Sequence, residues 1–216
     1  MASPTRVLLV RHGQARANVE RIIAGPRGCT GLTDTGRTEA GLLGRRLAAS
    51  GPRPDALICS PLPRARETAQ IVGEHLGTTP DRVDGDLVEL DPGQADGLSD
   101  DAYAKRYGHF DMLLEPDRPF APGGESWSAF RTRAETTMEQ LSREFQGRTV
   151  LCVCHAGFIV GAMVTLLDIP RPGNTTDLSP QSTSITEFGH DGGRWNLVRY
   201  NDHAHLESPG PSLSPT

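Results

Sequence analysis

The sequence predicts an α/β fold, a three-layer α/β/α sandwich with a mainly parallel central sheet. Short apolar runs alternate with amphipathic segments through most of the chain, which is the pattern of a parallel sheet covered by helices on both faces. The length of 216 residues suits one such domain with a sizeable core and is short for two. We therefore expect a single domain over residues 1–202, with ligands bound at the carboxyl ends of the strands.

The N-terminal part predicts a strand, a loop and a helix. Residues 6–10 are an apolar run followed by Arg-His-Gly, as expected for a buried strand that ends in a loop. Residues 19–32 are irregular and glycine-rich, which favours a loop. Residues 33–50 carry apolar side chains on one helical face, with a threonine to cap the start and Gly51-Pro52 to end the helix.

Two more strands and a helix follow. Residues 56–59 form a second buried apolar run. Ser60 is expected to cap the next helix, with Pro61 in its first turn and Gly77 at its end. Residues 87–90 are again apolar and predict a third, short strand.

Residues 92–124 are the least regular part of the chain and predict an insertion. It holds several prolines and one short helical segment over residues 99–107. Such an insertion is more typical of a lid or a substrate wall than of a separate domain. A long amphipathic helix is predicted next, over residues 125–145.

The C-terminal part predicts three strands and one more helix. Residues 149–154 read as a strand and residues 157–167 as a helix. Two strands at residues 183–188 and 195–200 are separated by Asp-Gly-Gly, a hairpin signal. Residues 203–216 are polar and rich in Pro, Ser and Gly, which predicts a disordered tail.

Composition and charge indicate which classes of binding partner the protein is not expected to have. The net charge of -5 argues against nucleic acid, which calls for a basic face. No apolar run approaches the roughly 18 residues of a membrane span, and the N-terminus lacks the apolar core of a signal peptide. We therefore expect no membrane partner and a cytoplasmic location. Lys105 is the only lysine, which is typical of a GC-rich bacterial genome. The four cysteines are predicted to be free, mostly buried thiols.

Four predicted strand ends carry the side chains that phosphoryl transfer needs. His12, Arg64, Glu89 and His155 each follow or end a different strand-like run. Arginine stays protonated and its planar fork binds two phosphate oxygens at once. A neutral imidazole nitrogen can attack phosphorus, and a carboxylic acid can protonate the leaving oxygen. The set predicts a site that acts on phosphate monoesters.

Five ordered motifs resemble the signature of the histidine phosphatase superfamily, which contains the cofactor-dependent phosphoglycerate mutases and many small-molecule phosphatases. The motifs are Leu8-Leu9-Val10-Arg11-His12-Gly13-Gln14 with Asn18, Leu32-Thr33-Asp34-Thr35-Gly36-Arg37, Ser60-Pro61-Leu62-Pro63-Arg64-Ala65-Arg66-Glu67-Thr68-Ala69, Leu87-Val88-Glu89 with Gly93 and Gly97, and Cys154-His155-Ala156-Gly157. The resemblance spans Arg6 to Tyr200 and implies a phosphoglycerate mutase-like fold.

The resemblance also implies a role for each matching residue. His12 takes the phosphoryl group, and Arg11, Arg64 and His155 hold its oxygens. Glu89 protonates the leaving group and later activates water. Four more positions are implied to border the phosphate, namely Gly13, which leaves room near the backbone, Gln14, Asn18, and Ala156 through its N–H. No metal or other cofactor is implied, because arginine and histidine supply the positive charge.

Some assignments stay open at this stage. Glu89 has rivals in the nearby carboxylates Asp86, Asp91 and Asp96, and Arg16 faces either solvent or substrate. Five apolar side chains are divided between the core and the pocket. Trp127 and Phe130 are predicted to belong to the core, whereas Phe110, Met112 and Leu113 fit a pocket wall as well as any other place.

Hydrolysis is expected over phosphoryl transfer between substrates. Mutases of the family carry a glutamate after Arg-His-Gly and basic residues after the acidic motif, whereas this chain has Gln14 and an acidic segment with few cations, Lys105, Arg106 and Arg118. That field disfavours a strongly anionic substrate such as a bisphosphate. We expect a phosphomonoester hydrolase acting on a small metabolite, either a sugar phosphate or nucleotide-like. The alternatives are a phosphoglycerate mutase-type phosphotransferase and a non-catalytic regulator that binds a phosphorylated ligand. Whether the protein forms a homodimer stays open at this stage.

Overall fold

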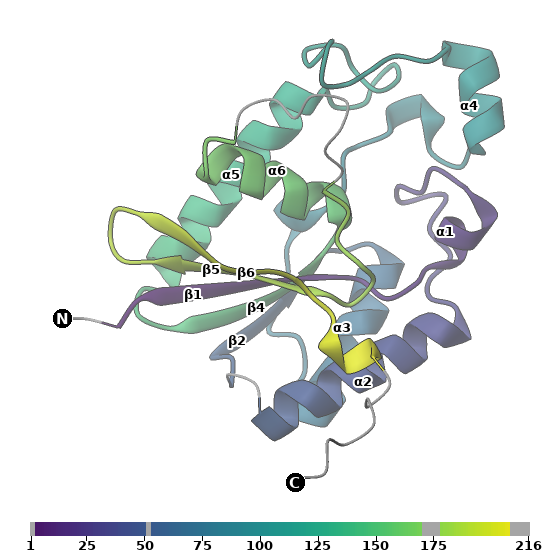
Figure 1. The fold of residues 1–216 in the computed structure, drawn as a ribbon. Coiled ribbons are helices and arrows are strands. Elements are labelled where there is room, and N and C mark those ends of the chain that lie inside the picture. The colour runs from purple at the N-terminus through teal and green to yellow at the C-terminus, as the bar shows by residue number, and fades with distance from the viewer. Residues whose placement is uncertain (1–2, 51–52, 170–177, 208–216) are drawn as a thin grey trace, which may run out of the picture.

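A single six-stranded sheet forms the centre of the computed structural model, which describes residues 3–50, 53–169 and 178–207 (Figure 1). The strand order is β3-β2-β4-β1-β5-β6. Strands β3, β2, β4 and β1 are parallel to one another. Strand β5 is antiparallel to both of its neighbours, β1 and β6. The strands are β1 (Thr5–Arg11), β2 (Ala56–Cys59), β3 (Arg82–Val83), β4 (Thr149–Cys154), β5 (Ile185–His190) and β6 (Trp195–Asp202). The predicted α/β fold with a mainly parallel sheet is confirmed.

Helices cover both faces of this sheet, with α5 and α6 on one side and α2 and α3 on the other (Figure 1). Side chains alternate along β1, so Val7 and Leu9 pack toward α5 and α6 while Leu8 and Val10 pack toward α2 and α3. The α-helices are α1 (Arg16–Glu20), α2 (Asp34–Ser50), α3 (Pro63–Leu76), α4 (Asp100–Tyr107), α5 (Trp127–Glu144) and α6 (Ala156–Leu166). Two buried layers of apolar side chains thereby hold the sheet between the helices.

Two helix starts follow local hydrogen bonds. Thr33 caps α2 as expected, because its Oγ1 accepts the Gly36 N–H at 3.0 Å. The start of α3 differs from the prediction. Ser60 and Pro61 precede the helix, Leu62 is its N-cap and Pro63 its first residue. Proline suits that position because the N–H it lacks has no partner within the helix.

The expected strand at residues 87–90 is wrong. The third parallel strand is β3, whose exposed pair Arg82 and Val83 joins the edge of β2. Leu87 ends the 3₁₀ helix η1 (Gly85–Leu87) and is fully buried in the layer under α5. The apolar character of this run reflects burial against a helix and not pairing in the sheet.

Residues 92–124 lie beyond the ends of the parallel strands, close to α1 (Figure 1). They contain the 3₁₀ helix η2 (Gly93–Ala95) and α4, which confirms the short helix expected over residues 99–107 and which Ser99 caps through its hydroxyl. The loop after α1 joins this segment, since Ile23 N–H donates to the Leu98 carbonyl at 2.9 Å and Gly97 N–H to the Ile23 carbonyl at 2.8 Å.

The C-terminal hairpin of β5 and β6 is confirmed. The predicted disorder is wrong for residues 203–207, which include the 3₁₀ helix η3 (Ala204–Leu206). His205 Nε2 lies 2.9 Å from Thr183 Oγ1 and so attaches this turn to the start of β5. Residues 208–216 lie outside the described residues. The four cysteines are free and buried. No described helix combines the length and hydropathy that a membrane crossing requires.

Candidate active site

His12 directly follows β1 and is 3% exposed. Its N–H donates to the Cys154 carbonyl at 3.0 Å, and the next N–H, that of Gly13, donates to Thr68 Oγ1 at 3.0 Å. Glycine is required at position 13 because a Cβ there would lie 2.5 Å from the Gly36 carbonyl oxygen. The structure therefore gives Gly13 a packing role against α2, and the expected clearance for phosphate stays a prediction.

Hydrogen bonds define which nitrogen of His12 carries the ring proton. Nδ1 lies 2.7 Å from the Gly13 carbonyl oxygen, which can only accept. The Arg64 Nε–H donates to His12 Nε2 at 3.0 Å, and guanidinium can only donate. The network thus assigns the ring proton to Nδ1 and a lone pair to Nε2. Burial, followed by the charges of Arg64 and Arg11, holds the pKa of His12 well below its ordinary value. The imidazole is therefore neutral, with its lone pair on Nε2.

Two guanidinium groups flank this nitrogen. Arg64 lies in the first turn of α3, is 5% exposed, and also donates to the Ala24 carbonyl at 2.8 Å. Arg11 ends β1 and donates through Nη1 to the Pro180 carbonyl at 2.6 Å, while its buried Nε has no hydrogen-bond partner. A buried donor without a partner costs free energy unless a ligand satisfies it.

His155 lies between β4 and α6, as the N-cap of α6. Its ring packs against the ring of His12, and the two ring centroids are 5.2 Å apart. It is fully buried, and burial, then the charges of Arg64, His12 and Arg11, lower its pKa well below the ordinary value. Its Nε2 lies 2.8 Å from Ser60 Oγ, and its Nδ1 has no partner. A serine hydroxyl can donate or accept, so this contact leaves the tautomer of His155 undefined, and Nδ1 is a second buried nitrogen without a partner near His12.

Ser60 is the residue that sequence reasoning placed in the wrong role. It was expected to cap α3, yet its hydroxyl orients the ring of His155. The only sequence signal for this role was the position of Ser60 at the start of the third motif. The structure shows that Ser60 does not cap α3, whose N-cap is Leu62.

Glu89 is the acidic residue at the site. Its Oε2 accepts the Gly157 N–H at 3.0 Å and its Oε1 the Leu90 N–H at 3.1 Å. Any side chain at position 157 would collide with this carboxylate, which explains the glycine. The rival Asp96 accepts the N–H groups of Gly25, Arg27 and Gly28 and so anchors the loop after α1. The rivals Asp86 and Asp91 are exposed and do not border the cavity.

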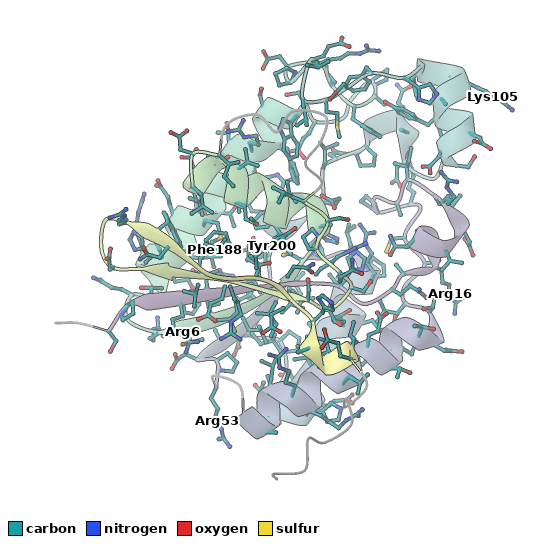
Figure 2. The ribbon with its side chains drawn as sticks, viewed as in Figure 1. Arg6, Arg16, Arg53, Lys105, Phe188 and Tyr200 are labelled. Carbon is teal, nitrogen blue, oxygen red and sulfur yellow. The ribbon has the colours of Figure 1, made fainter. Side chains whose placement is uncertain are left out.

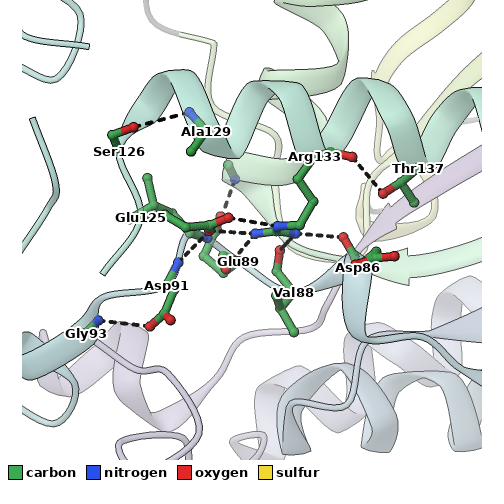
Figure 3. A network of polar contacts seen from close by, with 12 residues as sticks. Asp86, Val88, Glu89, Asp91, Gly93, Glu125, Ser126, Ala129, Arg133 and Thr137 are labelled. Atoms are coloured by element: carbon green, nitrogen blue, oxygen red, sulfur yellow. Dashed lines mark hydrogen bonds and ion pairs between the residues drawn. The ribbon is translucent and has the colours of Figure 1, made fainter. Parts of the chain in front are cut away.

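Arg133 of α5 holds the segment that carries Glu89 (Figure 3). Its Nε and Nη2 donate to the two carboxylate oxygens of Glu125 at 2.9 and 2.8 Å. Its Nη1 donates to the carbonyl oxygens of Asp86 and Val88 at 2.7 and 3.1 Å. Glu89 has no helix or strand of its own, so this ion pair fixes the backbone that precedes it.

Glu125 extends the same network to the residues after Glu89. Its Oε2 accepts the Asp91 N–H at 2.9 Å. Burial works to raise the pKa of Glu125, but the hydrogen bonds from Arg133 and from the Asp91 N–H outweigh burial and lower the pKa. The carboxylate is therefore ionised in its half-buried position.

A cavity of about 340 Å³ collects most of the predicted site residues. Its wall includes Arg11, His12, Asn18, Arg64, Glu89 and Ala156. His155 and Gly13 contact His12, but neither borders the cavity. Gln14 does not border it either, because its Oε1 accepts the Thr33 hydroxyl at 2.8 Å. Arg16 is exposed, as Figure 2 shows at the edge of the molecule.

The rest of the wall is apolar and was only partly expected. Met112 borders the cavity, whereas Phe110 and Leu113 do not. Trp127 and Phe130 belong to the core, as predicted, and also border the cavity. Sequence reasoning missed several lining residues from separate loops, namely Ile22, Ile23, Leu90, Pro92 and Phe120.

The polar end of the cavity suits a phosphoryl group. Two arginines, the unsatisfied Nε–H of Arg11 and the start of α6 lie around His12 Nε2. A helix start attracts anions, and the N-cap of α6, His155, makes no side-chain cap hydrogen bond; of the first N–H groups, that of Gly157 donates to Glu89. Among the described residues, no group of three or more His, Cys, Asp or Glu side chains is placed to hold a metal ion.

Known proteins match the chain along nearly its whole length. A model of the histidine phosphatase superfamily (branch 1) matches residues 7–203. A 2,3-bisphosphoglycerate-dependent phosphoglycerate mutase from Methylobacterium sp. (strain 4-46) is 36% identical over 181 residues, or 81% of this chain and 84% of the relative. An acid phosphatase from Mycobacterium tuberculosis is 31% identical over 187 residues, or 86% of this chain and 87% of the relative. The solved structure of Bacillus stearothermophilus YhfR has a TM-score of 0.81 at 29% identity, covering 94% of this chain and all of its own.

Proposed function

The chain belongs to branch 1 of the histidine phosphatase superfamily, and we propose that it is a phosphomonoester hydrolase that forms a phosphohistidine on His12. The observation that carries the proposal is the state of His12. It is a buried neutral imidazole with its lone pair on Nε2, beside the Arg64 guanidinium and the unsatisfied Nε–H of Arg11. A nucleophile and an oxyanion site are thereby combined in one cavity.

The reaction proceeds in two steps. His12 Nε2 attacks phosphorus as the bond to the ester oxygen breaks, and Glu89 donates its proton to that oxygen. Water then attacks the phosphohistidine, Glu89 takes up the proton of the water, and inorganic phosphate leaves. Arg64 and Arg11 stabilise the phosphoryl oxygens throughout, so the proposal calls for no metal ion.

Three observations favour hydrolysis over a mutase reaction. The cavity wall carries no cation besides Arg11 and Arg64 among the described residues, so a second acidic group of a substrate lacks a partner. Arg118 of the insertion pairs with Glu115 instead, at 3.1 Å. Lys105 points away from the body of the molecule (Figure 2).

Phosphate release from a broad panel of monoesters, measured beside His12→Ala, tests the proposal. We expect the variant to lose nearly all turnover, while His109→Ala, a change at an exposed histidine, leaves turnover unchanged. If His12→Ala retained more than about a tenth of the turnover, a barrier change under about 1.4 kcal/mol, the covalent mechanism would be wrong.

The two alternative functions predict other outcomes. A mutase, the activity in the name of one relative, would interconvert phosphoglycerates and release no phosphate from the panel. A regulator that only binds a phosphorylated ligand would bind phosphate without acquiring an acid-labile label on His12. Glu89→Gln should keep phosphate binding and slow turnover, most strongly for poor leaving groups.

A further inference from the structure

The cavity has a polar end and an apolar remainder. The polar end is the phosphate site around His12. The remainder is formed by Ile22 and Ile23 from the loop after α1, by Leu90, by Met112 and Phe120 from the insertion, and by Trp127 at the start of α5. The side chains that would contact the alcohol part of a substrate are therefore mainly hydrocarbon.

Few polar groups of the wall are left to recognise hydroxyl groups. The polar side chains of the wall are Arg11, His12, Asn18, Arg64 and Glu89, together with the indole N–H of Trp127. Both carboxylate oxygens of Glu89 already accept N–H groups, and Asn18 Oδ1 accepts the Ala15 N–H at 3.0 Å. A polyol in this space would leave several hydroxyls without partners, which opposes binding.

Cations of the insertion do not turn toward the cavity. Arg118 lies over the Phe110 ring at 4.2 Å in addition to its ion pair, and Arg106 lies over Tyr107 at 5.3 Å. Lys105 and Arg106 are exposed. A carboxylate or a second phosphate on the substrate would thus enter an apolar space without a counter-ion, which disfavours it strongly.

Given the proposed phosphomonoester hydrolase activity, on which this inference rests, we propose that the substrate is the monophosphate ester of an apolar alcohol. The alcohol is an aryl or medium-chain alkyl group, and not a sugar, another polyol or an acid. A volume of about 340 Å³ lies near the lower end of the range for ligand pockets, so it suits the phosphate with one ring or one short chain.

Straight-chain alkyl monophosphates from ethyl to octyl, compared with glycerol phosphate, test this class. Their leaving groups are closely similar, so differences in kcat/KM report binding of the carbon chain. We expect kcat/KM to rise about fourfold for each methylene until the cavity is full, from the transfer of about 0.8 kcal/mol per buried methylene. Glycerol phosphate should remain near the ethyl ester.

A pair of variants on the insertion separates the cavity from the rest of the surface. Met112→Gln should reduce the rise to less than about twofold per methylene, because an amide replaces the thioether that contacts the carbon chain. Leu114→Gln is the matched control, because Leu114 is 67% exposed and does not border the cavity. It should leave the series unchanged.

Each outcome bears on one proposal. A flat series in which glycerol phosphate is hydrolysed as well as octyl phosphate overturns the apolar subsite and leaves the hydrolase intact. A rise that Met112→Gln and Leu114→Gln alter equally also overturns the subsite. Release of no phosphate from any ester contradicts the proposed function itself.

Discussion

Replacement of Arg133 by methionine should both destabilise the fold and slow the protonation of the leaving group. Methionine keeps an unbranched apolar stem and removes the guanidinium group with its charge and every donor. Four hydrogen bonds of 3.1 Å or less are lost, two to Glu125 and two to the carbonyl oxygens of Asp86 and Val88. Glu125 keeps only the Asp91 N–H as a partner among these contacts.

The loss of stability can be worked from the exposure of the pair. Removing one partner of a fully buried ion pair costs about 3–5 kcal/mol. The side chains of Arg133 and Glu125 are 18% and 22% exposed, so water partly solvates the remaining carboxylate. We therefore expect a loss of about 2–3 kcal/mol, which lowers Tm by about 4–12 °C in a domain of this size.

The loss should depend on pH. The pKa of Glu125 is lowered in the folded protein, so its ionised form contributes stability above the unfolded pKa of about 4.3. That contribution disappears as pH falls through the folded pKa. The Tm difference between parent and variant should therefore be largest near neutral pH and shrink below about pH 4.

Turnover distinguishes positioning from stability alone. If Arg133 positions Glu89, kcat at 25 °C should fall about 10- to 100-fold for an alkyl phosphate and less than about threefold for para-nitrophenyl phosphate, whose leaving group needs no proton. Arg131→Met is the matched control, since Arg131 lies on the same helix and donates to Thr165 at 3.1 Å instead. An equal fall for both substrates would refute positioning of the acid, and so would unchanged turnover of the alkyl ester.

Three further predictions follow from single contacts. Gly157→Ala should slow alkyl phosphate turnover about tenfold or more, because the new Cβ displaces the Glu89 carboxylate, whereas Gly161→Ala on the same helix meets ordinary contacts at 3.6 Å or more and should be near neutral in the same kinetic assay. The ring of His12 should stay neutral with its proton on Nδ1 at pH 6, read from ¹⁵N chemical shifts; because its pKa is lowered on folding, unfolding should become easier as pH falls below about 6.5, and a His12 midpoint near 6.5 would contradict the assignment. Ser60→Ala should weaken binding of inorganic phosphate about tenfold by calorimetry, since His155 loses the hydroxyl that orients it, and unchanged affinity would remove that role.

Sequence reasoning placed the polar end of the site well because topology does most of that work. His12, Arg64 and His155 follow three adjacent parallel strands, and the carboxyl ends of parallel strands meet at one edge of a sheet. Gln14 also follows β1 but does not border the cavity, because of a local hydrogen bond. Its side chain turns to Thr33, a contact that spacing alone does not reveal.

Residues 87–90 show why apolar character alone mispredicts a strand. Leu87 is buried by α5, and the carbonyl oxygens of Val88 and Glu89 accept from the Arg133 side chain. An arginine on an amphipathic helix looks like a solvated residue in the sequence. Its partners in this segment lie 44 to 47 positions away along the chain, so no local period reports them.

The apolar wall was predicted only in part, for a related reason. The insertion was expected to form a substrate wall, but the wall also includes side chains from the loop after α1 and from the start of α5, which stand in irregular or helical stretches. What unites them is the packing of loops, such as the pairing of Ile22 with Ser99. Sequence periodicity describes helices and strands, and it contains no information on how separate loops meet.

The acid and the substrate wall share one anchor, which has a consequence for how specificity can vary. Glu125 receives Arg133 on one side and the Asp91 N–H on the other, immediately before Pro92 opens the insertion. The phosphate-holding groups depend on the sheet and on α3 and α6 instead. Changes between residues 92 and 124 can therefore reshape the wall while the ion pair keeps Glu89 in place and the sheet keeps His12 in place. Because the two anchors are separate, selection can change the alcohol that is accepted without changing the chemistry at phosphorus.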